Sequence, residues 1–241
     1  MSEYYLSAVI HGESKVGKTE LATTSPGRIL YLDAEEGGMR YVQQPRITWD
    51  PLREDVPAPG DWKICRVKID NDLTLSTAID FLERGQHSFN SVVWDSITEA
   101  QTYLKRAKSA TYTLQQSDWG DLLARIEGYI TRMRDAVSRQ EDMCSLVVIA
   151  QSAPRDSDGR MAPTVQGAMK NKLAYKLDIT GYLFTAVDEA GERRRGLRIE
   201  ESREAVAGAR WPRGLEKPDV IWDPDIGQIQ QTLEQHMREG H

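Results

Sequence analysis

The chain has 241 residues, with 31 basic and 37 acidic side chains and a formal net charge of −6. This length suits one large α/β domain or two small ones, and the acidic balance argues against a broadly basic nucleic-acid binder without excluding a local basic surface. The apolar runs are only as long as a strand, so we expect no membrane span. The first strand begins too early to leave room for a signal peptide, and Cys65 and Cys144 lack the spacing of zinc ligands. We therefore expect a cytoplasmic protein with reduced thiols.

A glycine-rich stretch follows the first predicted strand. Residues 4–10 are β-branched, aromatic and apolar, and residues 18–25 can form a short helix that Pro26 and Gly27 end. Between them the chain reads G-x-x-x-x-G-K-T, the P-loop pattern, in which glycines let backbone N–H groups point at phosphate oxygens. Lys18 would supply positive charge for the β- and γ-phosphates, and the Thr19 hydroxyl would ligate Mg²⁺. The alternative is a plain glycine-rich turn. The predicted nucleotide site comprises Gly12, Glu13, Ser14, Lys15, Val16, Gly17, Lys18 and Thr19.

Two further strands end in acidic residues. The strand 28–32 leads into Asp33-Ala34-Glu35-Glu36-Gly37-Gly38, and the strand 91–96 carries Asp95 at its carboxyl end, in the form of a Walker B. Carboxyl ends of parallel strands form the edge where ligands bind, and Asp95 would hold Mg²⁺ through water, opposite Thr19. Between these strands we expect a surface loop at 45–59, an edge strand at 64–69, and a helix whose apolar face includes Leu75 and Leu82 and which ends at Gly85.

The second half alternates helices and strands. We expect a helix at 97–108, a polar stretch at 110–117 and a long amphipathic helix at 119–137. The most apolar strand, 145–150, belongs beside the P-loop strand and ends in Gln151; a functional loop at 152–167 and a short basic helix at 170–176 follow. A strand at 178–185 then turns through 188–192 into a returning strand at 196–200, before a loop at 208–214, an apolar segment at 220–222 and a helix at 226–237.

Tyr31-Leu32-Asp33-Ala34-Glu35, Trp94-Asp95-Ser96 and Ile149-Ala150-Gln151, in this order after the P-loop, resemble the RecA family of recombination ATPases. The likeness is greatest to the minimal, core-only RecA-like proteins of bacteriophages and covers roughly residues 6–199. It implies an α/β fold: a RecA-like P-loop NTPase core with a mostly parallel twisted sheet flanked by helices and an antiparallel hairpin extension near the C-terminus. A single domain would span 1–241, with the core at about 4–200 and the extension at 201–241. ATP and Mg²⁺ are the implied cofactors.

The resemblance also implies residue roles. Glu35 matches the glutamate that activates the attacking water, although Glu36 competes for that role and a solvated acidic turn is the alternative. Asp95 matches the Walker B aspartate. Gln151 matches the glutamine that senses the γ-phosphate, with a simple strand cap as the alternative. A basic residue late in the core would complete the site of the neighbouring subunit; Arg210 is the best-placed candidate, ahead of Arg203 and the run 193–195.

Two loops of RecA proteins contact DNA, and their positions here would be about 105–118 and 152–169. Cations with an interleaved aromatic suit single-stranded DNA, which exposes phosphates and base faces, but a solvated basic surface explains them as well. The expected DNA-binding residues are Lys105, Arg106, Lys108, Tyr112, Arg155, Arg160, Lys170 and Lys172.

These features together predict a DNA-dependent ATPase that acts in phage recombination or single-strand annealing. Its expected partners are single-stranded DNA, further copies of itself in a ring or short filament with ATP sites at the interfaces, and other phage recombination or replication proteins in the host cytoplasm. A small-molecule kinase with the 155–160 loop as its lid, and a nucleotide-gated assembly protein with little hydrolysis, are the alternatives. Separate N- and C-terminal domains of full-length RecA have no room here, which favours annealing over full strand exchange.

Overall fold

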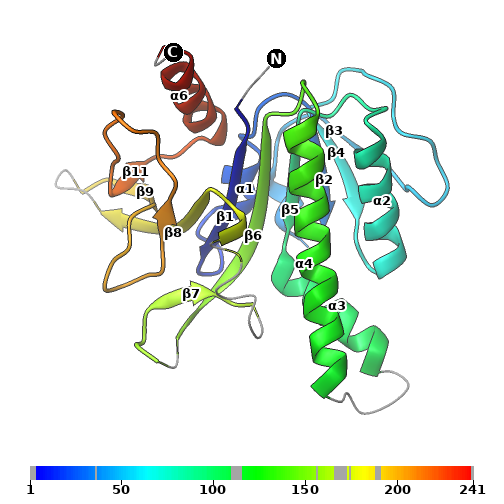
Figure 1. Cartoon of the computed structure of the whole chain (residues 1–241), viewed down its shortest axis with the longest axis horizontal. Coiled ribbons are helices and arrows are strands. Elements are labelled where there is room, and N and C mark those ends of the chain that lie inside the picture. Colours follow the sequence, from blue (N-terminus) through cyan, green and yellow to red (C-terminus); the bar gives the residue numbers. More distant parts are fainter. Residues whose placement is uncertain are drawn as a thin grey trace.

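In the computed structural model the chain folds around one large twisted sheet (Figure 1). The structure describes residues 4–35, 37–109, 116–155, 157–165, 173, 175–187 and 191–239, and eleven strands lie among them. Seven neighbouring strands run parallel in the order β8-β1-β6-β5-β2-β4-β3, and β9 and β11 extend the sheet beyond β8 in antiparallel fashion. The predicted α/β fold, a mostly parallel sheet with an antiparallel C-terminal extension, is confirmed.

The strands are β1 (Leu6–Gly12), β2 (Ile29–Asp33), β3 (Arg46–Thr48), β4 (Ile64–Lys68), β5 (Ser91–Asp95), β6 (Ser145–Pro154), β7 (Met161–Pro163), β8 (Ile179–Val187), β9 (Arg193–Arg198), β10 (Gly208–Ala209) and β11 (Val220–Trp222). The helices are α1 (Lys18–Ala22), the 3-10 helix η1 (Gly38–Tyr41), α2 (Asp72–Arg84), α3 (Ile97–Ser109), α4 (Gln116–Arg139) and α6 (Ile226–Glu239). The predicted helices and strands therefore exist, with boundaries shifted by a few residues, apart from the short basic helix predicted at 170–176, most of which lies outside the described residues.

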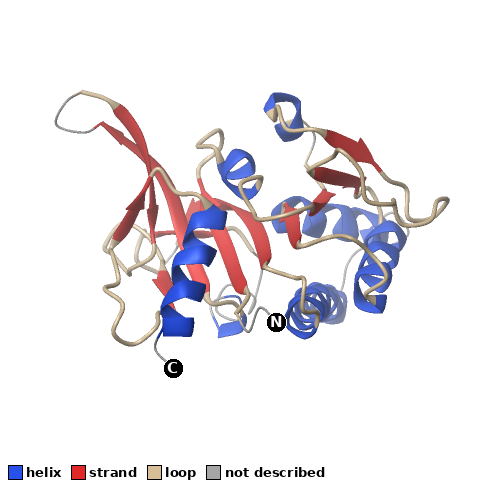
Figure 2. Ribbon diagram, turned by 90° about the horizontal axis from the view of Figure 1, so that it is seen from above, coloured by secondary structure: helices blue, strands red, loops and turns tan. Residues whose placement is uncertain are grey.

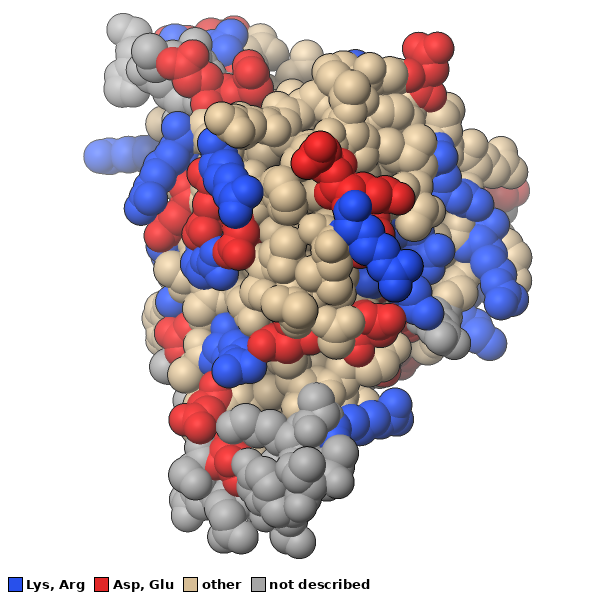
Figure 3. All heavy atoms as spheres, turned by 90° about the vertical axis from the view of Figure 1, so that its right-hand side faces the viewer, with Lys and Arg blue, Asp and Glu red and all other residues tan. Residues whose placement is uncertain are grey.

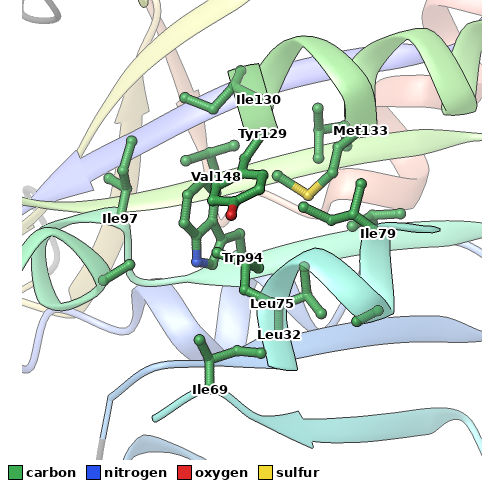
Figure 4. Packing of buried hydrophobic residues seen from close by; sticks show 14 of the residues in the cluster. Leu32, Ile69, Leu75, Ile79, Trp94, Ile97, Tyr129, Ile130, Met133 and Val148 are labelled. Atoms are coloured by element: carbon green, nitrogen blue, oxygen red, sulfur yellow. The ribbon is translucent and has the colours of Figure 1, made fainter. Parts of the chain in front are cut away.

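Helices cover both faces of the central parallel strands, which is why β1, β2 and β5 are buried along their whole length. On one face α2, α3 and α4 pack in a single cluster around Trp94 of β5 (Figure 4). On the other face α1 and α6 pack against β1 and β8, with Ile10 and Leu183 among the buried side chains. β6 is central and pairs with β1 so that Gly12 lies opposite Gln151, as predicted. This register brings the end of the P-loop strand beside Gln151.

Two stretches predicted as loops contain strands. In 45–59, β3 pairs with β4, so β4 is not the edge strand; the main-chain oxygen of Pro45 accepts hydrogen bonds from Lys63 and Ile64 and fixes this pairing. In 152–167, β6 continues to Pro154 and pairs with β7, and the N–H of Arg155 donates to the oxygen of Arg160 at 2.8 Å. We call residues 152–163, of which 156 is not described, the β6–β7 arm.

Two smaller predictions also need correction. The returning strand begins at Arg193 rather than near Gly196, because its pairing with β8 extends to Val187. The predicted loop 208–214 opens with β10, which pairs with β8. Figure 2 shows the β8–β9 hairpin projecting away from the rest of the sheet.

The outer surface of the helical layer carries charges of both signs. Over the face shown in Figure 3, basic and acidic side chains are intermixed. Between α2 and α4, Arg132 contacts Asp80 and Glu83, and Arg125 contacts Asp72. Such exposed pairs contribute roughly 1 kcal/mol or less each, so the buried cluster holds these helices together. Within the described part of the chain, no helix has the length and apolar character needed to span a membrane.

Candidate functional site

Four neighbouring strands bring the predicted site residues together. β1, β6, β5 and β2 lie side by side and parallel, so the P-loop, Gln151, Asp95 and Glu35 meet at their carboxyl edge. A cleft of about 1130 Å³ opens at this edge. Its lining includes Ser14, Lys15, Gly17, Lys18, Thr19, Glu20, Thr23, Glu35, Gly37, Gly38, Arg40, Tyr41, Val42, Gln43, Gln44 and Gln151.

The P-loop needs its glycines for two different reasons. A Cβ on Gly12 would lie 2.4 Å from the main-chain oxygen of Leu183, so β1 and β8 could not pack as they do. Gly17 caps α1 with φ 100°, a left-handed conformation that L side chains rarely adopt. The buried ammonium of Lys18 donates to the oxygens of Gly12 at 3.0 Å and Glu13 at 2.7 Å. Burial lowers the pKa of Lys18, while the Glu35 carboxylate opposes that shift.

Asp95 receives two hydrogen bonds on one carboxylate oxygen. The Thr19 hydroxyl donates to Oδ2 at 2.7 Å, and the buried hydroxyl of Tyr31 donates to the same atom. The other oxygen, Oδ1, is buried and has no hydrogen-bond partner among the described residues. A hard divalent cation takes oxygen ligands, and this orphaned oxygen beside a hydroxyl fits one. Thr19 and Asp95 are therefore suited to hold Mg²⁺ with a nucleotide.

Glu35 is held beside the cleft by the preceding aspartate. Oδ1 of Asp33 accepts a hydrogen bond from the Glu35 N–H at 3.2 Å, and Oδ2 of Asp33 accepts one from Nε of Arg66 at 2.6 Å. Burial and then the nearby Asp95 charge raise the pKa of Glu35, against an opposing effect of Lys18. A half-buried carboxylate with a raised pKa accepts a proton more readily than an exposed one.

Gln151 occupies the place where β6 leaves the sheet for the β6–β7 arm. Its main-chain N–H donates to the Thr98 hydroxyl at 3.1 Å, and its main-chain oxygen accepts a hydrogen bond from the N–H of Thr164 at 2.7 Å. One residue further on, Oγ of Ser152 lies 2.7 Å from Nδ1 of His11, which precedes the P-loop. The arm is thus tied to the P-loop strand at the edge of the cleft.

This geometry agrees with a comparison against protein families. The family described as an AAA domain matches residues 5–211. The chain belongs to the AAA domain family. Its AAA domain includes every strand from β1 to β10, and with them the whole cleft, which supports a P-loop ATPase of the AAA type. No curated protein matched the chain.

Several cleft residues of the AAA domain escaped the sequence analysis. η1 and the residues after it contribute Arg40, Tyr41, Gln43 and Gln44, and the ring of Tyr41 is 87% exposed beside the cleft. This stretch carries no recognisable motif. The signal that could have been used is its position, directly after Glu35 and at the ligand-binding edge.

Not all predicted basic residues lie near the cleft of the AAA domain. Arg210 donates to the oxygen of Tyr175 and pairs with Asp178, at the amino end of β8 and thus at the opposite edge of the sheet. Arg203 is exposed in the segment between β9 and β10. Arg195, in contrast, pairs with Glu20 of α1 and lies against the P-loop, since a Cβ on Gly17 would come within 2.6 Å of it.

Those predicted DNA-binding residues whose side chains the structure describes fall on two separate elements. On α3, the Lys105 ammonium lies 5.0 Å from the ring centre of Trp119, and Arg106 is exposed. On the β6–β7 arm, Arg160 pairs with Asp158 and Glu201, and Arg155 with Asp158. Tyr112, Lys170, Lys172 and the side chain of Lys108 lie outside the described residues, as does the competing Glu36.

Proposed function

We propose that this AAA domain binds ATP and hydrolyses it to ADP and phosphate. The observation that carries the proposal is the convergence of the P-loop, the Thr19–Asp95 pair and Glu35 in one cleft. The P-loop supplies N–H donors and the Lys18 charge for the phosphates, and Mg²⁺ held by Thr19 and Asp95 would neutralise charge on the β- and γ-oxygens. These are the components that phosphoryl transfer from a nucleoside triphosphate needs.

Glu35 is the general base in this proposal. Its carboxylate orients a water molecule and accepts one proton as the water oxygen forms a bond to the γ-phosphorus and the bond to the β–γ bridging oxygen breaks. Gln151 donates to a γ-phosphate oxygen and loses that partner when phosphate leaves. Because Gln151 directly precedes the β6–β7 arm, gain or loss of its bond to the γ-phosphate would be transmitted to the arm.

We further propose that the ATPase acts on single-stranded DNA in recombination or annealing, as an oligomer. The resemblance to RecA-like phage proteins supports this, together with the tie between the arm and the P-loop strand through His11 and Ser152. The kinase alternative would use the arm as a lid, yet its two arginines, Arg155 and Arg160, are already paired with Asp158 and Glu201. A basic residue acting across an interface, Arg210 or Arg203, remains part of the proposal.

Steady-state ATP turnover with and without a thymidine oligonucleotide tests the proposal. We expect Mg²⁺-dependent turnover that rises with the oligonucleotide, and loss of nucleotide binding in Lys18→Ala. Lys68→Ala is the matched control, because it removes the same charge at an exposed position of β4 that is not part of the cleft lining. If the oligonucleotide does not change ATP turnover, the protein is still an ATPase, but the proposed action on single-stranded DNA is contradicted. Phosphate transfer to a nucleoside or small metabolite would instead favour the kinase.

A further inference from the structure

The antiparallel part of the sheet carries a row of aromatic rings on one face. The strand registers place Phe184 of β8 and Trp222 of β11 opposite the same residue of β9, Gly196. The ring centres of Tyr182 and Phe184 lie 6.0 Å apart, and those of Phe184 and Trp222 lie 5.8 Å apart. A fourth ring, that of His11, lies 5.3 Å from Tyr182. The row therefore runs from the outermost strand to the residue that precedes the P-loop.

The two faces of this hairpin differ in what covers them. Residues of the opposite face, Leu183, Leu197 and Ile221, pack with α6 in a buried cluster. Tyr182, Phe184 and Trp222 belong to neither core cluster of the described residues; Tyr182 and Phe184 are partly exposed, and Trp222 is 44% exposed. A row of accessible rings outside the core is not needed to hold the hairpin to the domain, because the buried face already does so.

Arginines accompany the rings on the same face. The guanidinium of Arg198 lies 5.6 Å from the ring centre of Phe184, and that of Arg194 lies 5.6 Å from the ring centre of Trp222. Their carboxylate partners are at the surface: Asp223 is 55% exposed and Glu204 is 77% exposed. Pairs of this kind are worth roughly 1 kcal/mol or less, so a phosphate can replace the carboxylate at small cost.

Gly196 leaves room for the ring of Phe184 to pack against the backbone of β9. A Cβ on Gly196 would lie 2.6 Å from Cζ of Phe184, so the ring lies directly across the glycine backbone. A side chain here would lift Phe184 and break the line of rings. Tyr182 and Phe184 are nearly parallel, at 15°, and Trp222 meets Phe184 edge-on, at 72°, so the inner pair and Trp222 offer two differently oriented faces for stacking.

We propose that this surface, which we call the ring face and which consists of Tyr182, Phe184, Trp222, Arg194 and Arg198, binds single-stranded nucleic acid. Unpaired bases stack on exposed aromatic rings while arginines contact the phosphates between them. A duplex hides its base faces and would not use the rings in this way. The inference rests on the proposed function. It adds a contact area for nucleic acid that is separate from the two loops proposed above, 105–118 and 152–169.

The ring face also has a direct connection to the nucleotide cleft. His11, at the inner end of the row, lies 2.7 Å from Ser152 of the β6–β7 arm and 2.7 Å from the main-chain oxygen of Val206. Because a carbonyl only accepts, Nε2 carries the proton and Nδ1 accepts from the Ser152 hydroxyl. A nucleic-acid strand bound to the ring face would thus be separated from the β6–β7 arm only by the side chain of His11.

Fluorescence anisotropy of labelled thymidine and uridine oligonucleotides, measured with the full chain, Mg²⁺ and a non-hydrolysable ATP analogue, tests the ring face. We expect Trp222→Ala to weaken binding about tenfold, the loss of one stacked base. Arg194→Ala should weaken binding and reduce the slope of the logarithm of affinity against the logarithm of salt concentration by roughly one. Arg193→Ala is the matched control, because it removes the same charge from the adjacent residue, which points to the other face. Thermal unfolding of each variant shows that it is folded.

Photo-crosslinking with 5-iodouracil oligonucleotides locates the contact directly. We expect crosslinks in the peptides that carry Tyr182 and Phe184 or Trp222. If the wild-type chain binds oligonucleotide but the crosslinks and losses of affinity occur only in the two loops, the ring face is excluded and the proposed function stands. If the wild-type chain binds no oligonucleotide, both fail. If Trp222→Ala changes the sedimentation coefficient and leaves the affinity intact, a second copy of the chain covers the face and the inference is overturned. Comparing the affinities for the thymidine and the uridine oligonucleotide shows whether the ring face binds single-stranded DNA or single-stranded RNA.

Discussion

The hydroxyl of Tyr31 donates a hydrogen bond to Oδ2 of Asp95 within the buried centre of the sheet. Burial, followed by the charge of Asp95, raises the pKa of Tyr31, so the hydroxyl stays protonated and remains a donor at neutral pH. Tyr31 therefore acts as a positioning residue. It fixes the carboxylate so that Oδ1 stays directed away from both hydroxyl donors, available to a cation.

Tyr31→Phe should weaken the use of Mg²⁺ without removing the cleft. Loss of an outer-shell partner typically costs about tenfold or more in metal affinity, so half-maximal ATP turnover should need about ten times more Mg²⁺. Tyr129→Phe is the matched control, since it removes a hydroxyl that also donates to a carboxylate, that of Asp72, on the α2–α4 side. An identical Mg²⁺ dependence in both variants would show that the Tyr31 hydroxyl does not position Asp95.

Glu35→Gln should separate hydrolysis from binding. The amide keeps the shape of the side chain but cannot accept the proton of the attacking water, so turnover should fall by about 10²- to 10⁴-fold. Affinity for a fluorescent ATP analogue should stay within a fewfold of wild type. Glu99→Gln, a charge change close to Glu35 but outside the cleft lining, should leave turnover at neutral pH intact. Negligible turnover in wild type that Glu35→Gln does not change would assign this chain to nucleotide-gated assembly instead. Substantial turnover that is equal in the two would exclude Glu35 as the base and favour Glu36.

The acid limb of the turnover rate should lie above the usual pKa of a glutamate, 4.5, because burial and Asp95 raise the pKa of Glu35. The base form is the ionised one, so the rate rises with pH through this raised pKa and levels off above it. The Glu99 charge contributes to the increase, so Glu99→Gln should move the limb to lower pH. Turnover rates of both proteins, measured across the acid range at saturating ATP and Mg²⁺, check this. If Glu99→Gln does not move the acid limb of the pH–rate profile, a group other than Glu35 produces that limb.

Local patterns in the sequence were sufficient to predict which strand ends and which loop meet at the cleft. The P-loop is a contiguous motif, and Asp95 and Gln151 end apolar strands whose carboxyl ends must share one edge. The ring face and the role of Tyr31 depend instead on register. Tyr182 and Trp222 are far apart in the chain and align only through two antiparallel pairings with β9.

The errors in the sequence analysis have a similar physical cause. Residues 152–167 contain prolines and glycines that suggest a loop, but Pro154 ends β6, where its missing N–H costs no ladder bond, and Pro163 ends β7. β3 is short and mostly exposed, so it has no apolar pattern to reveal it. In both cases tertiary pairing, rather than local preference, decides the structure.

Tyr41→Ala should weaken ATP binding through the base rather than the phosphates. The ring is 87% exposed at the rim of the cleft, and stacking of one base on an aromatic ring is worth about 1–3 kcal/mol. We expect the dissociation constant for ATP to rise about tenfold, while that for inorganic triphosphate, which has no base, stays unchanged. Tyr175→Ala is the control, because Tyr175 is 78% exposed but lies near the amino edge of the sheet. Equal losses for ATP and triphosphate would contradict a stacking role.

His11 should make the stability of the fold depend on pH in a defined direction. Burial lowers its pKa from 6.5 to about 4, because the charged ring would lose its hydration. Between these values the unfolded chain binds a proton that the folded chain does not, so unfolding becomes easier as the pH falls from 6.5 to 4. The difference corresponds to roughly 3 kcal/mol of unfolding free energy, fully present above pH 6.5.

Urea unfolding at neutral pH and near pH 4 measures this contribution. His11→Gln keeps an amide that can donate to Val206 and accept from Ser152 but does not titrate, so its unfolding free energy should change less over this range than that of wild type. His236→Gln, at an exposed position of α6, should retain the wild-type pH dependence. Because His11 joins the P-loop strand to the arm, the same acidification should also uncouple oligonucleotide binding from ATP turnover in wild type before global unfolding. A pH profile of stability that is the same in wild type and His11→Gln would show that the pKa of His11 does not differ between the folded and the unfolded chain.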